Sequence, residues 1–226
     1  MSDNKEVWKP LTVTEIQMIF NKIPIRWWIA GGWALDLFLE RTTREHKDID
    51  TLILRCDHII LQEHLHDEWE MFKAYKGKLI PWNQEEQLDS HFDNIWAKKK
   101  GETTWAFQVM ILDTEDKHWI YKRNSAIRKL LDDIGLESPS GVPFLRPEIQ
   151  LLYKGGSSVI REKDVIDLNN VLPKLSDKKL HWLKKSLSIQ FPNGHPWIDV
   201  LDSYTKSLKH KLPNFKEIML CIHIRC

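Results

Sequence analysis

The sequence predicts an α+β protein whose first half is α/β and whose second half is helical. Two observations lead to this fold class. Up to about residue 135, apolar runs of strand length alternate with helical patterns. From Arg146 onward apolar residues recur only at helical spacing, after a short stretch marked by Pro139, Gly141 and Pro143. We therefore expect a small sheet domain followed by a helical subdomain.

The N-terminal elements follow from caps and apolar periodicity. Thr12 and Glu15 form a capping box that starts a helix over 12–22. The β-forming run at 25–30 predicts a buried strand, which Gly31-Gly32 ends. Further elements are expected as a helix over 33–39, a strand over 48–54 and a helix over about 58–68.

Strand-length runs continue the pattern. Residues 69–75 and 78–82 predict a hairpin, and 105–112 predicts a strand whose partner is 118–122. In the C-terminal half Pro147 suits the first turn of a helix, while Pro173 and Pro192 interrupt the later helices.

The composition excludes several classes of protein. Thirty-three basic against 32 acidic residues give a net charge of +1, which provides no basic surface for duplex nucleic acid. The most apolar stretch, 27–35, is far short of the ~20 residues that span a bilayer. Three scattered cysteines predict no disulfide framework and fit the reducing cytoplasm.

Two carboxylates are the strongest candidates for chemistry. Asp48 and Asp50 are two residues apart on a predicted strand, so both side chains share one face while Ile49 points to the core. Two neighbouring carboxylates repel each other unless a cation lies between them, and oxygen ligands suit Mg²⁺. The spacing therefore predicts a divalent metal site.

A second set of residues suits phosphate. Gly31 and Gly32 precede a predicted helix, where small residues and a helix N-terminus allow phosphate to approach the backbone. Arg44 and His46, with Lys47, come just before the two carboxylates and could neutralise a polyphosphate. Each signal is weak alone, but together they predict a nucleotide-binding site.

The segment from Ile29 to Thr51 resembles the nucleotidyltransferase superfamily, in which a Gly-Gly pair precedes Asp-x-Asp on the next strand. Gly-Gly-Trp-Ala-Leu-Asp-Leu and Thr-Arg-Glu-His-Lys-Asp-Ile-Asp are most similar to the aminoglycoside and lincosamide branch. Later pieces resemble uncharacterised bacterial relatives of that branch, and the resemblance covers roughly residues 12–201. These later pieces begin at Trp105, Trp119, Arg146, Lys163 and Gly194.

The resemblance implies a small mixed β-sheet flanked by helices over 1–135, a helical bundle over 143–202 and a tail over 203–226. It implies that Asp48 and Asp50 bind Mg²⁺ and that Gly31 and Gly32 face a nucleoside triphosphate such as ATP. The enzyme would move a nucleoside monophosphate to a hydroxyl of a small acceptor, aminoglycoside-like or lincosamide-like. Lys163 would reach the phosphates.

One departure from the family bears on catalysis. Relatives carry a third carboxylate on a later strand, and the matching strand here is 105–112. Alternation from Trp105 puts Phe107, Val109 and Ile111 inward and leaves Gln108 at the expected carboxylate position. An amide can hydrogen-bond a hydroxyl but cannot take its proton. Asp113 and Glu102 are the nearby acids that could substitute.

Three functions therefore stay open. The first is an active Mg²⁺-dependent nucleotidyltransferase, and the second is a lapsed member that binds nucleotide or a small ligand without turnover. The third is a tryptophan-rich interaction or sugar-binding module, since the chain has 11 tryptophans, although most of these rings are expected in the core. For the basic tail, an edge strand and a homodimer contact are the alternatives.

Overall fold

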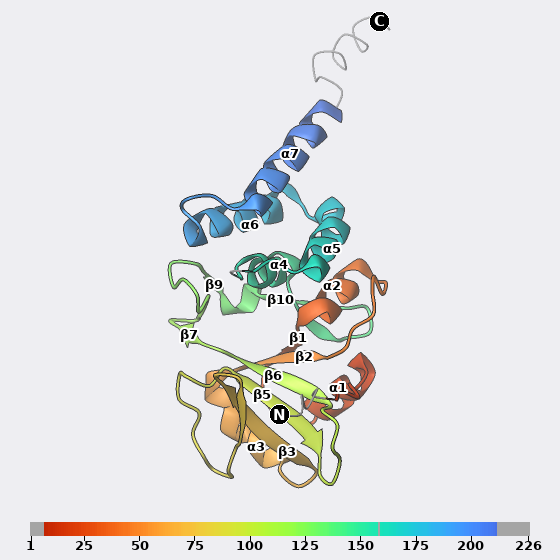
Figure 1. Ribbon diagram of the computed structural model, residues 1–226, viewed down its shortest axis with the longest axis vertical. Coiled ribbons are helices and arrows are strands. Elements are labelled where there is room, and N and C mark those ends of the chain that lie inside the picture. Colours follow the sequence, from red (N-terminus) through yellow and green to blue (C-terminus); the bar gives the residue numbers. More distant parts are fainter. Residues whose placement is uncertain (1–6, 158, 212–226) are drawn as a thin grey trace, which may run out of the picture.

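A computed structural model describes residues 7–157 and 159–211 of the chain. Its main sheet has eight strands in the order β10-β11-β1-β2-β6-β5-β3-β4. Two neighbouring pairs, β1 with β11 and β2 with β6, are parallel, and the other pairs are antiparallel. The sheet is therefore mixed, and the α+β fold class is confirmed (Figure 1).

The strands of the main sheet are short at one side and longer at the other. They are β1 Trp27–Ile29, β2 Asp50–Leu54, β3 Trp69–Tyr75, β4 Lys78–Pro81, β5 Asn94–Lys99, β6 Phe107–Leu112, β10 Gly135–Glu137 and β11 Pro143–Leu145. A second sheet of three strands contains β7 Thr114–Glu115, β8 His118–Ile120 and β9 Arg128–Leu130.

Seven α-helices accompany the sheets within the described residues. They are α1 Val13–Phe20, α2 Gly31–Leu39, α3 His58–Leu65, α4 Pro147–Gly155, α5 Glu162–Val171, α6 Asp177–Gln190 and α7 Pro196–Lys211. Three 3₁₀ turns lie at Arg55–Asp57, Leu131–Asp133 and Leu172–Lys174. None of the helices in the described ranges has the length and apolarity to cross a membrane.

Local signals account for several helix ends. Thr12 caps α1, and its hydroxyl and the Glu15 carboxylate form the predicted capping box. Pro147 lies in the first turn of α4, where its missing N–H costs no hydrogen bond. Both α5 and α6 end before the prolines that the sequence marked, at Val171 and Gln190.

The two faces of the main sheet differ. The face that carries Phe107, Val109 and Ile111 is buried, and Phe20 of α1 packs edge-on against Phe107 at 5.9 Å between ring centres. The opposite face carries Asp50. Helix α2 starts on that face and packs against α4 and α5 (Figure 1). This second face holds the candidate site.

Two expectations about strand 105–112 are wrong. Residues 118–120 pair with β7 and β9 in the small sheet, whereas β6 pairs with β2 and β5. Trp105 precedes β6 and does not share the inward face of Phe107. The centre of its ring lies 5.3 Å from that of Phe72 and 5.4 Å from that of Trp96, both on the other face. Non-local pairing decides both features, and the local pattern carries no information about it.

The sheet continues past the predicted boundary at residue 135, because β10 and β11 belong to it. Likewise α7 continues past residue 202. The division into two domains and a tail therefore stays a prediction. The apolar end of the tail, where the sequence leaves an edge strand and a homodimer contact as alternatives, lies outside the described residues.

The tryptophans are mostly core or partly buried. Six of the 11 are buried, at positions 27, 28, 69, 82, 119 and 197, and none of the others is fully exposed. The tryptophans therefore provide no row of exposed rings as a sugar-stacking surface, which weakens the interaction-module alternative.

Candidate active site

The two candidate metal ligands lie where β2 begins. Asp50 is the first residue of the strand and Asp48 precedes it, with Ile49 fully buried between them. Asp50 is half-buried, and neither carboxylate forms an ion pair within the described part of the chain. Burial, and next the negative charge of Asp48, raise the pKa of Asp50 to about 6. This electrostatic strain is what a bound cation would relieve.

Gly31 brings the start of α2 against Asp50. A Cβ at Gly31 would lie 2.3 Å from the Asp50 Oδ2 atom, and the φ angle of +66° also disfavours any side chain there. The Gly31 N–H donates to the Oε1 atom of Gln150 at 2.9 Å, so this donor is already used within the protein. Glycine is therefore required for close approach to the carboxylate.

Gly32 lies against two predicted nucleotide-binding side chains. A Cβ there would come within 2.3 Å of the His46 imidazole and 2.6 Å of the Arg44 guanidinium. The structure thus brings Gly32, Arg44 and His46 together. The space in front of Gly32 that we expected for phosphate is occupied by these side chains.

Alanine at Gly32 is expected to destabilise the protein by about 1–3 kcal/mol, since it overpacks a filled site. Urea unfolding of Gly32→Ala measures this loss. The matched comparison is His46→Ala alone and combined with Gly32→Ala, because removing the imidazole makes room for the methyl group. Equal losses in both backgrounds would mean that contact with His46 is not the cause.

His46 is held inside the protein by Asp36. Its Nε2 atom lies 2.6 Å from Asp36 Oδ2, both side chains are buried, and the imidazole lies 4.5 Å from the Trp33 ring. The other Asp36 oxygen accepts hydrogen bonds from the Thr43 hydroxyl at 2.6 Å and the Thr43 N–H at 3.2 Å. Asp36 therefore fixes the loop that leads to Asp48.

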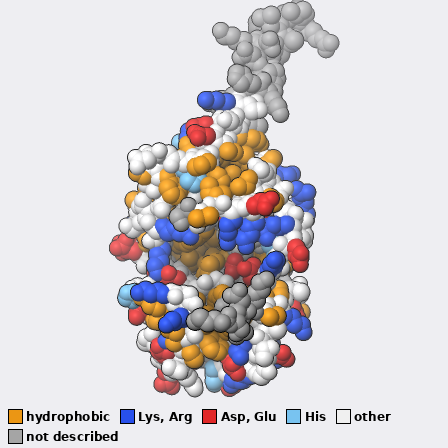
Figure 2. Space-filling model, in the orientation of Figure 1, with side chains coloured by type: hydrophobic (Ala, Val, Ile, Leu, Met, Phe, Trp, Pro, Cys, Tyr) orange, Lys and Arg blue, Asp and Glu red, His pale blue; other side chains and the backbone are white. Residues whose placement is uncertain are grey.

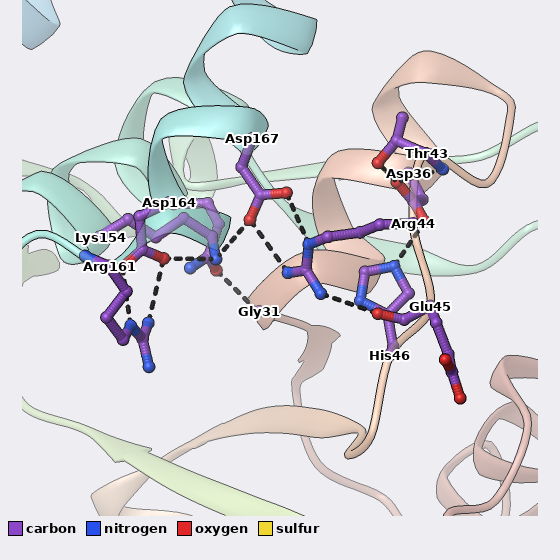
Figure 3. A network of polar contacts seen from close by, with 11 residues as sticks. Gly31, Asp36, Thr43, Arg44, Glu45, His46, Lys154, Arg161, Asp164 and Asp167 are labelled. Carbon is purple, nitrogen blue, oxygen red and sulfur yellow. Dashed lines mark hydrogen bonds and ion pairs between the residues drawn. The ribbon is translucent and has the colours of Figure 1, made fainter.

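Arg44 is likewise engaged. Its Nε and Nη2 atoms donate to the two oxygens of Asp167 on α5, at 2.9 and 3.0 Å (Figure 3). Lys154 of α4 lies 2.8 Å from the same carboxylate. Burial alone would raise the pKa of Asp167, but the hydrogen bonds from Arg44 and Lys154 hold it below its usual value. The nucleotide-binding role of Arg44 stays a prediction.

The network continues along α5. Asp164, one helical turn before Asp167, accepts from Lys154 at 3.3 Å and from Arg161 at 2.7 Å (Figure 3). Its spacing from Asp167 places both carboxylates on one helix face. Together with the Arg44–Asp167 pair, these contacts tie α4 and α5 to the loop that leads to Asp48 and Asp50.

Lys163 is the cation of α5 that no ion pair engages within the described part of the chain. Its positive charge, with those of Lys154 and Arg161, acts to lower the pKa of Asp50. The three cations, from α4 and the start of α5, are therefore close enough to Asp50 for their charge to act on it. A triphosphate held beside Asp50 would meet this positive charge.

Gln108 lies directly beside Asp50, because the two are register partners in parallel β2 and β6. It is half-buried and shares the face of Asp50, as the alternation predicted. No residue of β6, Phe107–Leu112, is acidic. Glu102 is exposed, and Asp113 is paired with Arg55, which also contacts Asp93 at 3.2 Å. Neither acid is placed beside Asp50 by strand pairing.

The residues in the described ranges contain no cluster of three His, Cys, Asp or Glu that could hold a metal ion. At this site the side chains thus offer two carboxylates and an amide. Sequence reasoning missed Asp36, Gln150, Lys154 and Asp167. Apart from lying in segments that resemble the family, they gave no signal, because each acts through a partner that is distant in the sequence.

A mixed sheet whose second strand starts at the second aspartate of Asp-x-Asp, against a helix that starts at Gly-Gly, is the arrangement that the resemblance to nucleotidyltransferases implies. A family model for aminoglycoside-2''-adenylyltransferase matches residues 12–136, more than half of the chain. The chain belongs to this family, and by family and fold it is a nucleotidyltransferase enzyme.

Solved structures agree with the fold. The lincomycin-bound lincosamide adenylyltransferase LnuA shares 18% identity, with a TM-score of 0.50 over 71% of this chain and 94% of that one. ANT(2'')-Ia in complex with adenylyl-2''-tobramycin shares 17% identity, with a TM-score of 0.50 over 78% of this chain and 97% of that one. No protein with a curated description matches the sequence.

Proposed function

We propose that the protein transfers a nucleoside monophosphate from a nucleoside triphosphate to a hydroxyl of a small acceptor, with Mg²⁺. The observation that carries the proposal is the Asp50 carboxylate, pressed against the Gly31 backbone beside Asp48 and without a cationic partner among the described residues. Two neighbouring carboxylates without an ion-pair partner are costly unless a cation binds between them, and the nearby charges of Lys154, Arg161 and Lys163 would favour a polyphosphate.

The donor set suits Mg²⁺, because two carboxylates supply hard oxygen ligands. Asp48 and Asp50 would hold the ion, which would neutralise charge on the reacting phosphate and stabilise the oxygens entering and leaving. Lys163 and Arg161 would balance the remaining phosphate charge.

The single described cysteine, Cys56, is free, which suits the cytoplasm as the place of the reaction.

The reaction is an in-line displacement. The acceptor oxygen forms a bond to the α-phosphorus, the bond to the pyrophosphate oxygen breaks, and pyrophosphate leaves with that electron pair. The hydroxyl proton must leave the acceptor oxygen. Gln108 can accept a hydrogen bond from this hydroxyl and orient it, but the proton passes to water or another base.

A second function is favoured by Gln108 itself. If positioning and charge stabilisation do not compensate for the absent carboxylate, the protein binds Mg-nucleotide without turnover. Both functions share the nucleotide site, and turnover separates them.

ATP is expected to raise the melting temperature of the protein in the presence of Mg²⁺ and much less with EDTA, since binding to the folded state stabilises it. A thermal-shift assay at millimolar ATP measures this. The control variant is Asp132→Asn, which changes one carboxylate to an amide at an exposed surface ion pair and should keep the shift. If no divalent ion produces a shift in the wild type, the nucleotidyltransferase proposal is wrong.

A further inference from the structure

On the Asp50 face helix α2 contacts β2 and β11, and β6, β5 and β3 extend this face away from it. Along β5 and the first five residues of β6 burial alternates, with Phe107, Val109 and Ile95 buried on one face and Gln108 and Trp96 half-buried on the other. Register joins the half-buried residues into one row, Asp50–Gln108–Trp96–Phe72. This row leads from the candidate metal site across β6, β5 and β3.

Figure 2, in the orientation of Figure 1, shows a hollow between the lower part of the molecule, which contains the sheet, and the helices above it. Apolar side chains lie inside the hollow, and charged side chains lie at its edge. The acceptor must reach the α-phosphate from a side that the nucleotide leaves free, and the row beyond Gln108 provides such a side.

Two polar atoms beside this row lack partners. The Oδ1 atom of Asn94 and the Nε1 atom of Trp96 are buried, and neither forms a hydrogen bond within the described part of the chain. Both residues are on β5, two apart, and pair in register with Met110 and Gln108. An unsatisfied buried group is costly, so a bound molecule that supplies one donor and one acceptor would recover free energy. Met110 is flexible enough to admit it.

The charges on this face are already balanced. Strands β2 to β6 place one carboxylate besides Asp50 on it within the described residues, Glu70, and this pairs with Lys98 at 2.8 Å. Trp96 is surrounded by other rings, with Trp8 at 4.8 Å and Trp105 at 5.4 Å between ring centres. Among the described strand residues a polycationic acceptor would find no unpaired carboxylate on this face besides Asp50, whereas an apolar or neutral ring would find aromatic surface.

We infer that the acceptor is an uncharged, hydroxylated ring compound, not a polyamine, and that Asn94 and Trp96 bind it. This inference rests on the proposed function. Asn94 accepts a hydrogen bond from one acceptor hydroxyl, and the Trp96 indole N–H donates to another oxygen. Gln108 then orients the reacting hydroxyl beside Asp50.

The test uses a matched pair of probes, phenyl β-glucoside and phenyl β-glucosaminide, which differ by one amine, together with tobramycin. Titration calorimetry measures their binding to the protein with Mg²⁺ and a non-hydrolysable ATP analogue. We expect the uncharged glucoside to bind best. Trp96→Phe and Asn94→Leu should each weaken its binding about fivefold, the loss of roughly one hydrogen bond, without changing analogue binding.

Trp105→Phe is the control, because it changes the same aromatic cluster without touching the two unpartnered atoms. Tighter binding of tobramycin, or unchanged glucoside binding in both β5 variants, overturns the inference while the proposed function stands. If the analogue itself does not bind with Mg²⁺, the proposed function fails. Since the readout is binding, a lapsed enzyme still gives a result.

Discussion

Asparagine in place of Asp50 should abolish transfer and at the same time stabilise the metal-free protein. The loss follows because Asn cannot supply the charge that holds Mg²⁺, and removing several kcal/mol of transition-state stabilisation lowers the rate by about 10³-fold or more. The gain in stability follows from the raised pKa of Asp50, which reaches about 6 in the folded protein.

The sign of the pH dependence is fixed by that shift. The ordinary pKa is 3.8, so as the pH rises the unfolded chain loses this proton before the folded protein does. Near pH 4 Asp50 lowers the free energy of unfolding little. As the pH rises from there through about 6, the folded protein must ionise this buried carboxyl, so the free energy of unfolding falls. The upper limit of this cost is about 3 kcal/mol. Asp50→Asn removes it.

Melting temperatures between pH 5 and 8, measured with EDTA, check this prediction. The difference between Asp50→Asn and wild type should grow from pH 5 to about pH 7 and then stay constant to pH 8, because the carboxylate is ionised in both states above its folded pKa. Mg²⁺ with ATP should reverse it by stabilising only the wild type. Asp132→Asn should match wild type throughout. An Asp50→Asn variant that is less stable than wild type at pH 8 would show that the ionised carboxylate has a stabilising partner.

The sequence predicted the elements that local chemistry decides. The capping box at Thr12, the helix at the glycine pair and the apolar strand after Asp50 each depend on neighbours along the chain, and all three are present, with the glycines forming the first two residues of α2. The parallel register that puts Gln108 beside Asp50 also agrees with the alternation in its strand. The expectation of a third carboxylate at the position of Gln108 came from the family resemblance and not from the alternation.

What the sequence could not predict depends on distant partners. Arg44 and His46 look like free cations next to an acidic motif, but Asp167 and Asp36 engage them. β5 was missed, because its apolar core is short and lysines follow it. The strands β9 to β11 have three residues each, too few for a periodicity. Their positions follow from pairing across the sheet.

The second large effect concerns Gln108. Gln108→Asp should raise the rate of transfer by up to about 10²–10⁴-fold, because it adds a proton acceptor next to Asp50, and general base catalysis is typically worth that much. Strand register places the new carboxylate on the same face as Asp50 and as its direct neighbour. The measurement is pyrophosphate release with Mg²⁺, a panel of nucleoside triphosphates and hydroxylated acceptors.

Two control variants test whether the gain in rate depends on a carboxylate at position 108. Met110→Asp puts a carboxylate on the same face one step along β6, beside Leu52, and should give no gain. Gln108→Asn keeps the amide and should not gain either. If Asp113 already acts as the base, Asp113→Asn abolishes transfer and Gln108→Asp adds nothing. That result would require Asp113 to leave Arg55, with which it pairs at the end of β6. If wild type and Gln108→Asp both bind Mg-nucleotide but release no pyrophosphate, the protein binds nucleotide without turnover. In that case the missing carboxylate is not the only feature that blocks the reaction.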